Sequence, residues 1–279
     1  MKSLVRWSAT LGLVGSTLLG SFFAENLQAL ALPEAEVVQK LQPVPVFTVA
    51  DAKGAPLVAS IPNQDNKKTT PVAGVFISQK DAQAFVERLK KEKPDLGKDV
   101  QVVPVSLAEV YKLKKDNENK PDGLNFAFIP VQQQVQSAQA LMGQSGQQQQ
   151  FQGTPLFVAT GGKDNGYLTV EQNGKPVIPF FFDKEQLQTM VDRFKQQKPD
   201  LASTVKVKAV PLEGVIQTLQ TKNDAQLNSI VLVPSQESIE FVRSLPAAPA
   251  QNRSQPPASA PQNAPRTQPQ NAPQNPQRR

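Results

Sequence analysis

The sequence Lys93-Pro94-Asp95-Leu96 occurs a second time, unchanged, as Lys198-Pro199-Asp200-Leu201, which lies 105 residues further along the chain. Around these two sites, residues 75–110 align without a gap on residues 180–215 at the same offset. Self-similarity at a fixed spacing indicates that one structural unit is repeated. The unit spans roughly a hundred residues, the size of a small domain, so we predict a tandem duplication of one domain-sized unit.

Each copy is predicted to contain an amphipathic helix after an apolar strand. In the first copy, Ser78 stands at a capping position, and apolar residues then recur at helical spacing as far as Leu89. In the second copy, Asp183 takes the place of Ser78 and precedes a matching apolar stripe. Proline disfavours helical backbone in the residue before it, so Pro94 and Pro199 are expected to end these helices.

The remaining pattern predicts the order β-β-β-α-β-α-β-α for one copy. We expect a hairpin around Asp51-Ala52-Lys53-Gly54, and further elements at residues 100–105, 106–115, 124–129 and 130–142. Strands that alternate with helices favour an α+β or mixed α/β fold in which helices pack on sheets. Two copies predict a body with pseudo-two-fold symmetry, with either one sheet per copy or strands shared across the joint.

Both ends of the chain are predicted to lie outside the folded body. Residues 1–31 carry Lys2 and Arg6, an apolar run at 11–23 and the site Ala29-Leu30-Ala31, the pattern of a secretory signal peptide. The run is shorter than the roughly 18 residues of a spanning helix, so an uncleaved membrane anchor is the less favoured alternative. Residues 246–279 are rich in proline, glutamine and asparagine, and we expect a disordered tail.

A glutamine-rich linker is predicted at residues 143–153, between the two copies. The expected organisation is therefore a signal peptide at 1–31, a first repeat at 32–142, the linker, a second repeat at 154–245 and the tail at 246–279.

The chain contains no cysteine and no histidine, which removes much of the usual chemistry of enzymes. It has no disulfide framework, no thiol nucleophile, no histidine base and no histidine ligand for zinc. No glycine loop of the phosphate-binding type is present either. We therefore expect a protein that is not an enzyme and that has no catalytic residues, no metal site and no cofactor.

Carboxylate pairs are the remaining candidates for acid and base catalysis. The two pairs are Asp81 with Glu87 and Glu185 with Asp192, and each falls on the polar side of a predicted helix. We favour a solvated helix face for both pairs, because exposed carboxylates are what an amphipathic helix places there.

The net charge of +6 lies mostly at the two ends of the chain. The tail carries four arginines and no acid, and residues 1–31 contribute +1, so the body between them is left at +1. A nearly neutral body does not fit nucleic-acid binding.

A basic cluster occurs at Lys112, Lys114, Lys115 and Lys120. We interpret it as a solvated helix end, with at most peripheral contact to a membrane.

Phe180-Phe181-Phe182 places aromatic rings on both faces of one strand. A sheet that is covered on both faces explains this run and is the favoured interpretation. The alternative is that Phe180, Phe182 and Phe157 line an exposed groove for apolar segments of a client, meaning another polypeptide that the protein binds.

Residues 43–245 resemble the family named after the twenty-two-kilodalton component of the chloroplast inner-envelope translocon. The resemblance is carried by Val44-Pro45-Val46-Phe47-Thr48-Val49, Gly74-Val75-Phe76-Ile77-Ser78, Gln101-Val102-Val103-Pro104-Val105 and Phe128-Ile129-Pro130. It implies an exported protein of the periplasm or thylakoid lumen in cyanobacteria, and of the intermembrane space in chloroplasts. It also implies a chaperone for proteins in transit, including outer-membrane β-barrel precursors, and brings no catalytic residues with it.

The sequence leaves three functions open. The leading hypothesis is a non-enzymatic chaperone or escort that binds apolar segments of unfolded or precursor polypeptides without a nucleotide. The alternative is a structural scaffold subunit of a translocon or assembly machine. An exported hydrolase that uses paired carboxylates is a third and less favoured reading.

Overall fold

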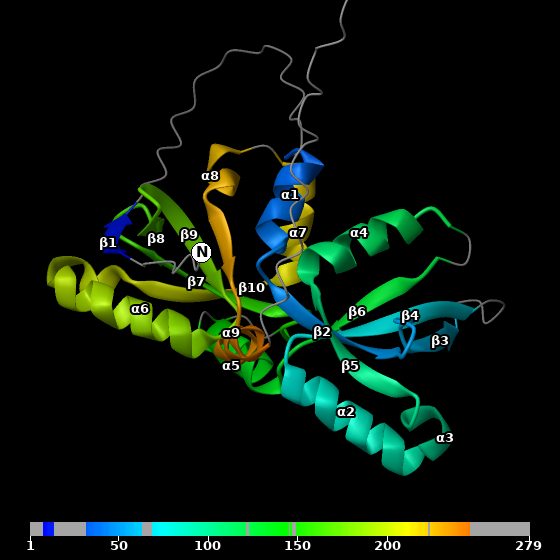
Figure 1. Ribbon diagram of the computed structural model, residues 1–279. Coiled ribbons are helices and arrows are strands. Elements are labelled where there is room, and N and C mark those ends of the chain that lie inside the picture. Colours follow the sequence, from blue (N-terminus) through cyan, green and yellow to red (C-terminus); the bar gives the residue numbers. More distant parts are fainter. Residues whose placement is uncertain are drawn as a thin grey trace, which may run out of the picture. The chain divides into compact units, whose positions relative to one another are not determined.

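Two β-sheets, one from each half of the chain, form the framework of the fold (Figure 1). The computed structural model describes residues 8–13, 32–62, 69–120, 123–144, 146, 149–222 and 224–245. The described elements up to Ser244 belong to one compact unit. Helices pack on both sheets, so the predicted α+β class is confirmed.

The first sheet is built around a central antiparallel strand. Its strands are β2 (Pro45–Asp51), β3 (Val58–Pro62), β4 (Thr69–Phe76), β5 (Val100–Ser106) and β6 (Asn125–Ile129). Strand β2 pairs antiparallel with β4 and β5, and β6 pairs parallel with β4. The expected hairpin differs in its partner: β3 pairs with β4, and the chain before it meets β2 at a bridge between Ala50 and Pro56. Gly54 makes the turn with a φ of 84°, which favours glycine.

The second sheet repeats this pattern of pairing. Its strands are β7 (Pro155–Gly161), β8 (Gly166–Gln172), β9 (Lys175–Phe181), β10 (Lys206–Pro211) and β11 (Ile230–Val233), with β1 (Ser8–Leu13) added to β8. Strand β7 pairs antiparallel with β9 and β10, and β11 pairs parallel with β9. One sheet per half is therefore present, whereas duplication as the origin of the halves, and the boundaries 32–142 and 154–245, stay predictions.

The helices also correspond between the halves. They are α2 (Gln79–Glu92), α3 (Pro94–Gly97) and α4 (Leu107–Asn117) in the first half, and α6 (Lys184–Gln197), η1 (Pro199–Thr204) and α7 (Leu212–Thr221) in the second. The predicted cap of α2 is confirmed, because Ser78 Oγ accepts from the Asp81 amide at 3.1 Å. Asp183 occupies the N-cap position of α6 as predicted, but its side chain makes no capping hydrogen bond within that helix. Its carboxylate accepts instead from the Gln236 amide, at 2.8 Å, 53 residues further on.

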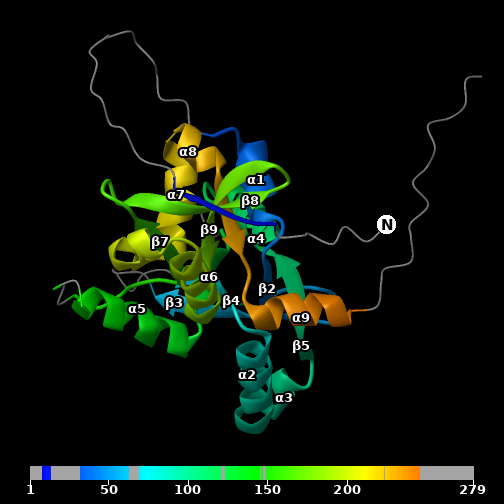
Figure 2. The same ribbon diagram turned by 90° about the vertical axis from the view of Figure 1, so that its left-hand side faces the viewer.

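The last helix of each half packs on the other half's sheet. Helix α5 (Gln132–Gln144) lies against β7 and β10, and its Ala138 belongs to the buried cluster around Phe157. Helix α9 (Gln236–Ser244) lies beside β2 and α2 (Figure 2), where the ring of Phe241 meets Phe47 edge to face at 5.1 Å. The sequence did not indicate this exchange, because an apolar helix face does not specify which sheet it covers.

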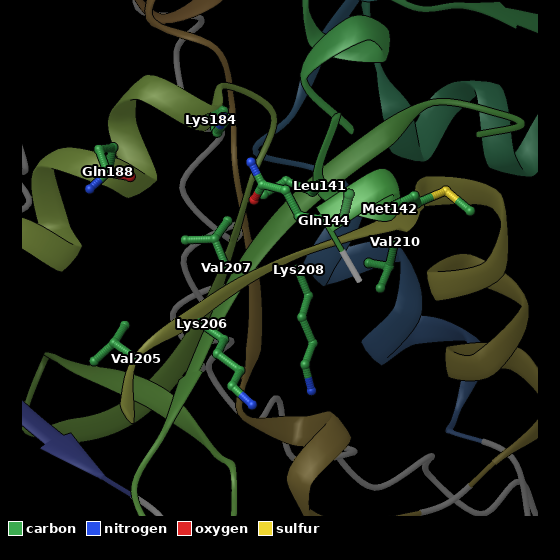
Figure 3. A pocket seen from close by; sticks show the side chains of 11 residues that line it. Leu141, Met142, Gln144, Lys184, Gln188, Val205, Lys206, Val207, Lys208 and Val210 are labelled. Carbon is green, nitrogen blue, oxygen red and sulfur yellow. The ribbon is translucent and has the colours of Figure 1, made fainter. Parts of the chain in front are cut away.

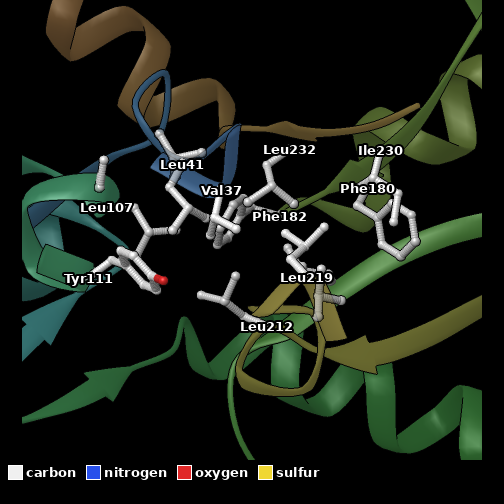
Figure 4. Packing of buried hydrophobic residues seen from close by; sticks show 14 of the residues in the cluster. Val37, Leu41, Leu107, Tyr111, Phe180, Phe182, Leu212, Leu219, Ile230 and Leu232 are labelled. Atoms are coloured by element: carbon white, nitrogen blue, oxygen red, sulfur yellow. The ribbon is translucent and has the colours of Figure 1, made fainter. Parts of the chain in front are cut away.

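One hydrophobic cluster joins the two halves (Figure 4). It contains Val46 and Leu107 from the first half and Phe180 and Phe182 from the second. Helix α1 (Glu34–Leu41) adds apolar side chains and contacts α4, α7 and β11. Lys40 Nζ of α1 donates to the carbonyls of Asn228, at 2.9 Å in the short helix α8 (Ala225–Asn228), and of Ile230, at 3.0 Å in β11. The halves are therefore held together by a shared core and by α1.

Several predictions concern residues outside the described ranges. The disordered tail at 246–279 lies outside them, as does the predicted signal peptide except for Ser8–Leu13, which form β1. Part of the predicted linker is described: Gly143 continues α5, and the Phe151 amide donates to Gln139 Oε1 at 2.6 Å. No helix within the described ranges is long and apolar enough to cross a membrane.

Candidate functional site

The three phenylalanines proposed for an exposed groove are buried. Their exposed fractions are 0% for Phe157, 4% for Phe180 and 3% for Phe182. Phe180 and Phe182 lie in the central cluster, whereas Phe157 opposes Phe181 in the register of β7 and β9 and lies in the cluster beneath α6. Both faces of β9 are covered, because the central core lies on one side and α6 on the other. The alternative that these three rings line an exposed groove is therefore wrong. The favoured interpretation, a strand buried on both faces, describes β9.

An open groove lies elsewhere, between α5, the start of α6 and strand β10 (Figure 3). Its volume is about 750 Å³. Its apolar lining comprises Leu141, Met142, Val205, Val207, Ala209 and Val210. The groove thus owes its apolar lining to the exchanged helix α5 together with an edge strand of the second sheet.

Three lysines border this groove. Lys206 and Lys208 come from β10 and point to the opposite side of the strand from Val207 (Figure 3), and Lys184 begins α6. No acidic residue is among the described residues that line it. An apolar segment with acidic residues beside it matches this combination of lining and charge.

A glutamine of α5 holds the two helices that frame the groove. Gln134 Nε2 donates to Glu185 Oε2 at 2.8 Å, and the Lys184 amide donates to Gln134 Oε1 at 3.1 Å. Both polar atoms of this buried amide are satisfied, so Gln134 fixes α5 against the N-terminus of α6.

The exchanged helix α9 is attached in a similar way in the first half. Glu237 accepts from Ser78 Oγ at 3.0 Å and from the Lys80 amide at 2.8 Å. Burial, and secondly the nearby Glu237, raise the pKa of Asp81. Burial also raises the pKa of Asp183, against the opposing effect of its bond from the Gln236 amide. The Glu237 carboxylate therefore joins α9 to the start of α2, and the Asp183 carboxylate joins α9 to the start of α6.

A second, smaller cavity lies between the two halves, with a volume of about 310 Å³. Phe126 and Phe128 of β6 border it together with Ile216 of α7. Tyr111 also lines it, and its hydroxyl accepts from Gln220 Nε2 at 3.3 Å. Leu107 and Val110 add apolar side chains to this cavity, and its polar and charged lining residues are Lys114, Glu213, Gln217 and Gln220.

The carboxylates considered for acid and base catalysis bond other side chains and not each other. Glu87 accepts from Lys90 Nζ and Gln83 Nε2, both at 3.0 Å. Asp192 accepts from Gln188, at 2.8 Å, while Glu185 bonds Gln134. Each of these carboxylates bonds a different neighbour, as expected for helix faces. No group of three metal-ligating side chains occurs in the part of the chain that the structure describes.

The fold and the groove define a class of protein: an α+β body of two similar halves that share one core and carry an apolar groove with a basic border. The sequence profile of the Tic22-like family matches residues 12–244, and the chain belongs to this family. The resemblance seen in the sequence is thereby confirmed.

Solved and curated relatives agree with this assignment. The structure of Tic22 from Anabaena, a protein-transport protein, is similar with a TM-score of 0.70 and 35% identity, over 78% of this chain and 100% of that chain. The chloroplastic protein TIC 22 of Arabidopsis thaliana is 25% identical over 228 residues, which cover 76% of this chain and 79% of that protein. The chloroplastic TIC 22 of Pisum sativum is 22% identical over 207 residues, covering 74% and 75% respectively.

Proposed function

We propose that this protein is an exported, non-enzymatic chaperone or escort that binds apolar segments of polypeptides in transit. The observation that carries the proposal is the groove of α5, α6 and β10, which offers apolar side chains in an open hollow of about 750 Å³. Grooves of this kind receive apolar side chains of a partner, and burial of each Å² of apolar surface contributes about 25 cal/mol. The solved relative from Anabaena is a protein-transport protein, which supports the same class of function.

The proposed partners are unfolded or precursor polypeptides, with outer-membrane β-barrel precursors and translocon components among them. The proposed location is the periplasm or thylakoid lumen, and it rests on the predicted signal peptide together with the chloroplastic relatives. The lysine border favours clients in which acidic residues flank an apolar segment.

Suppression of aggregation tests the proposal. An unfolded β-barrel protein is diluted into buffer without ATP, and light scattering is followed with the full chain at near-stoichiometric amounts. We expect suppression by the native protein and at least a threefold weaker effect for Met142→Gln, which removes an apolar side chain from the groove without changing charge.

Leu113→Gln is the matched control, because Leu113 is 49% exposed on α4 and does not line the groove. It should suppress aggregation as the native protein does. Equal losses in the two variants would refute the assignment to this groove. No suppression by a well-folded native sample would reject the chaperone proposal and favour the scaffold subunit.

A further inference from the structure

Strand β8 carries an additional strand from a distant part of the sequence. Residues Ser8–Leu13 form β1, which runs antiparallel to β8 and places Leu11 opposite Val170, Gly12 opposite Thr169 and Leu13 opposite Leu168. Residues 14–31 separate β1 from Leu32, so no tight turn sets this pairing. β1 therefore joins the sheet in the way that a separate extended peptide adds to a sheet edge.

β1 and β9 lie on opposite edges of β8. β8 pairs with β7 at Gly166 and Tyr167, and with β9 from Val170 to Gln172. Val170 and Glu171 are paired with β9 and also with β1, so β1 occupies the edge of β8 that faces away from β9. An edge strand offers backbone N–H and C=O groups, which act as a template for another extended chain.

In the first half, the strand that corresponds to β8 is β3. Among the described residues, β3 carries no added strand of the kind that β1 forms on β8. β3 occupies in the first sheet the position that β8 occupies in the second, and β4 is its paired strand among the described residues. It stays exposed along its length, with Val58 at 44% and Ile61 at 50%.

We propose that the edge of β8 is a strand-addition site whose partner in the exported protein is an extended, uncharged segment of a second polypeptide. The predicted signal peptide includes β1, so its removal on export vacates the edge. The chemistry of the partner follows from β1, whose sequence Ser-Ala-Thr-Leu-Gly-Leu holds small and apolar residues and no charge. The inference rests on the proposed function and adds main-chain pairing as a second mode of client binding.

Disulfide trapping tests the site, because the native chain has no cysteine that would compete. Opposed residues of an antiparallel pair lie at a Cα separation of roughly 4.5–5.5 Å, which a disulfide spans. In the full chain, the double variant Gly12→Cys and Thr169→Cys should form an intramolecular disulfide on mild oxidation. This first step verifies the register of β1.

The second step uses a chain that begins at Leu32. It keeps the three buried clusters, whose members lie between Leu32 and Phe241. Thr169→Cys in this chain is mixed, in a glutathione buffer, with a synthetic peptide of residues 6–15 that carries Gly12→Cys. We expect at least ten times more mixed disulfide with this peptide than with a scrambled peptide. N-methylation of alternate peptide amides removes donors of the strand pairing, so it should lower the yield of mixed disulfide by a similar factor.

Ser60→Cys is the matched control, since it places a thiol on the corresponding strand β3. Amide exchange of the cysteine-free chain gives a second readout, in which the native peptide should slow exchange in residues 166–172. Equal trapping by native and scrambled peptides, equal trapping at Ser60→Cys, or unchanged exchange in β8 would each overturn the proposal. Trapping and amide exchange measure strand pairing, whereas light scattering measures suppression of aggregation. The strand-addition site can therefore be refuted while the chaperone proposal stands, and the chaperone proposal can be refuted while strand pairing is observed.

Discussion

Replacement of Phe241 by alanine should destabilise the protein by about 2–3 kcal/mol. A fully buried phenylalanine costs about 3–5 kcal/mol when truncated to alanine, and Phe241 is only partly buried against the cluster of Phe47. Its edge-to-face contact with Phe47, at 5.1 Å between ring centroids, adds about 0.5–1.5 kcal/mol to the part due to burial. Urea denaturation of the full chain, followed by circular dichroism, measures the change as a lower midpoint at constant slope.

Two further variants make this test specific to the exchanged helix. Val242 is the next residue of α9 and is 47% exposed, so Val242→Ala should cost less than about 0.5 kcal/mol. Combining Phe241→Ala with Phe47→Ala should reveal a coupling of about 0.5–1.5 kcal/mol, because the two rings touch. A loss for Phe241→Ala no larger than that for Val242→Ala, or full additivity with Phe47→Ala, would refute the packing of α9 on the first sheet.

Three other predictions follow from the buried core and from the polar contacts of α9. Phe182→Ala should lower the free energy of unfolding by about 3–5 kcal/mol, since the ring fills the central cluster, and a urea midpoint close to that of the native protein would contradict its burial. Glu237→Ala should cost about 1 kcal/mol in the same assay by leaving Ser78 Oγ and the Lys80 amide without their acceptor, whereas no loss would show that these bonds do not hold α9. Burial raises the pKa of Asp183 above its ordinary value of 3.8. As pH falls, the folded state therefore binds this proton before the unfolded state does, so the contribution of this carboxyl to stability grows between pH 7 and 3.8. Asp183→Asn should remove this part of the pH dependence, and identical slopes of urea midpoint against pH in the two proteins would disprove it.

Local patterns in the sequence predicted the helices and the fold class. The helical spacing after Ser78 and the cap at Ser78 both correspond to α2 as observed. The same pattern after Asp183 predicted α6, and Asp183 does occupy the N-cap position, but its carboxylate bonds the amide of Gln236, far along the chain, and no amide of α6. A local motif identifies a helix start well, whereas it carries no information on a competing partner from another element.

The candidate site shows the same limit. An uninterrupted run of three phenylalanines is compatible with a strand covered on both faces and with a strand that borders a groove. The sequence alone therefore did not decide between them, and the structure places Phe180 and Phe182 in the core. The alternation of Val205 and Val207 with Lys206 and Lys208 indicated a half-buried strand. The sequence analysis still missed the groove, because the other wall of the groove comes from α5, a distant part of the chain.

The sequence by itself determined that two similar halves exist, where their main helices begin, and that cysteine and histidine chemistry is absent. Self-similarity, periodicity and composition carry this information because each is read from the order and identity of the residues, without any knowledge of their contacts. The tertiary structure alone decided which sheet α5 and α9 cover, which phenylalanines are buried, where an apolar groove lies and which strand pairs with the edge of β8. These features depend on contacts between residues far apart in the chain, whose partners are chosen by the packing of the whole core.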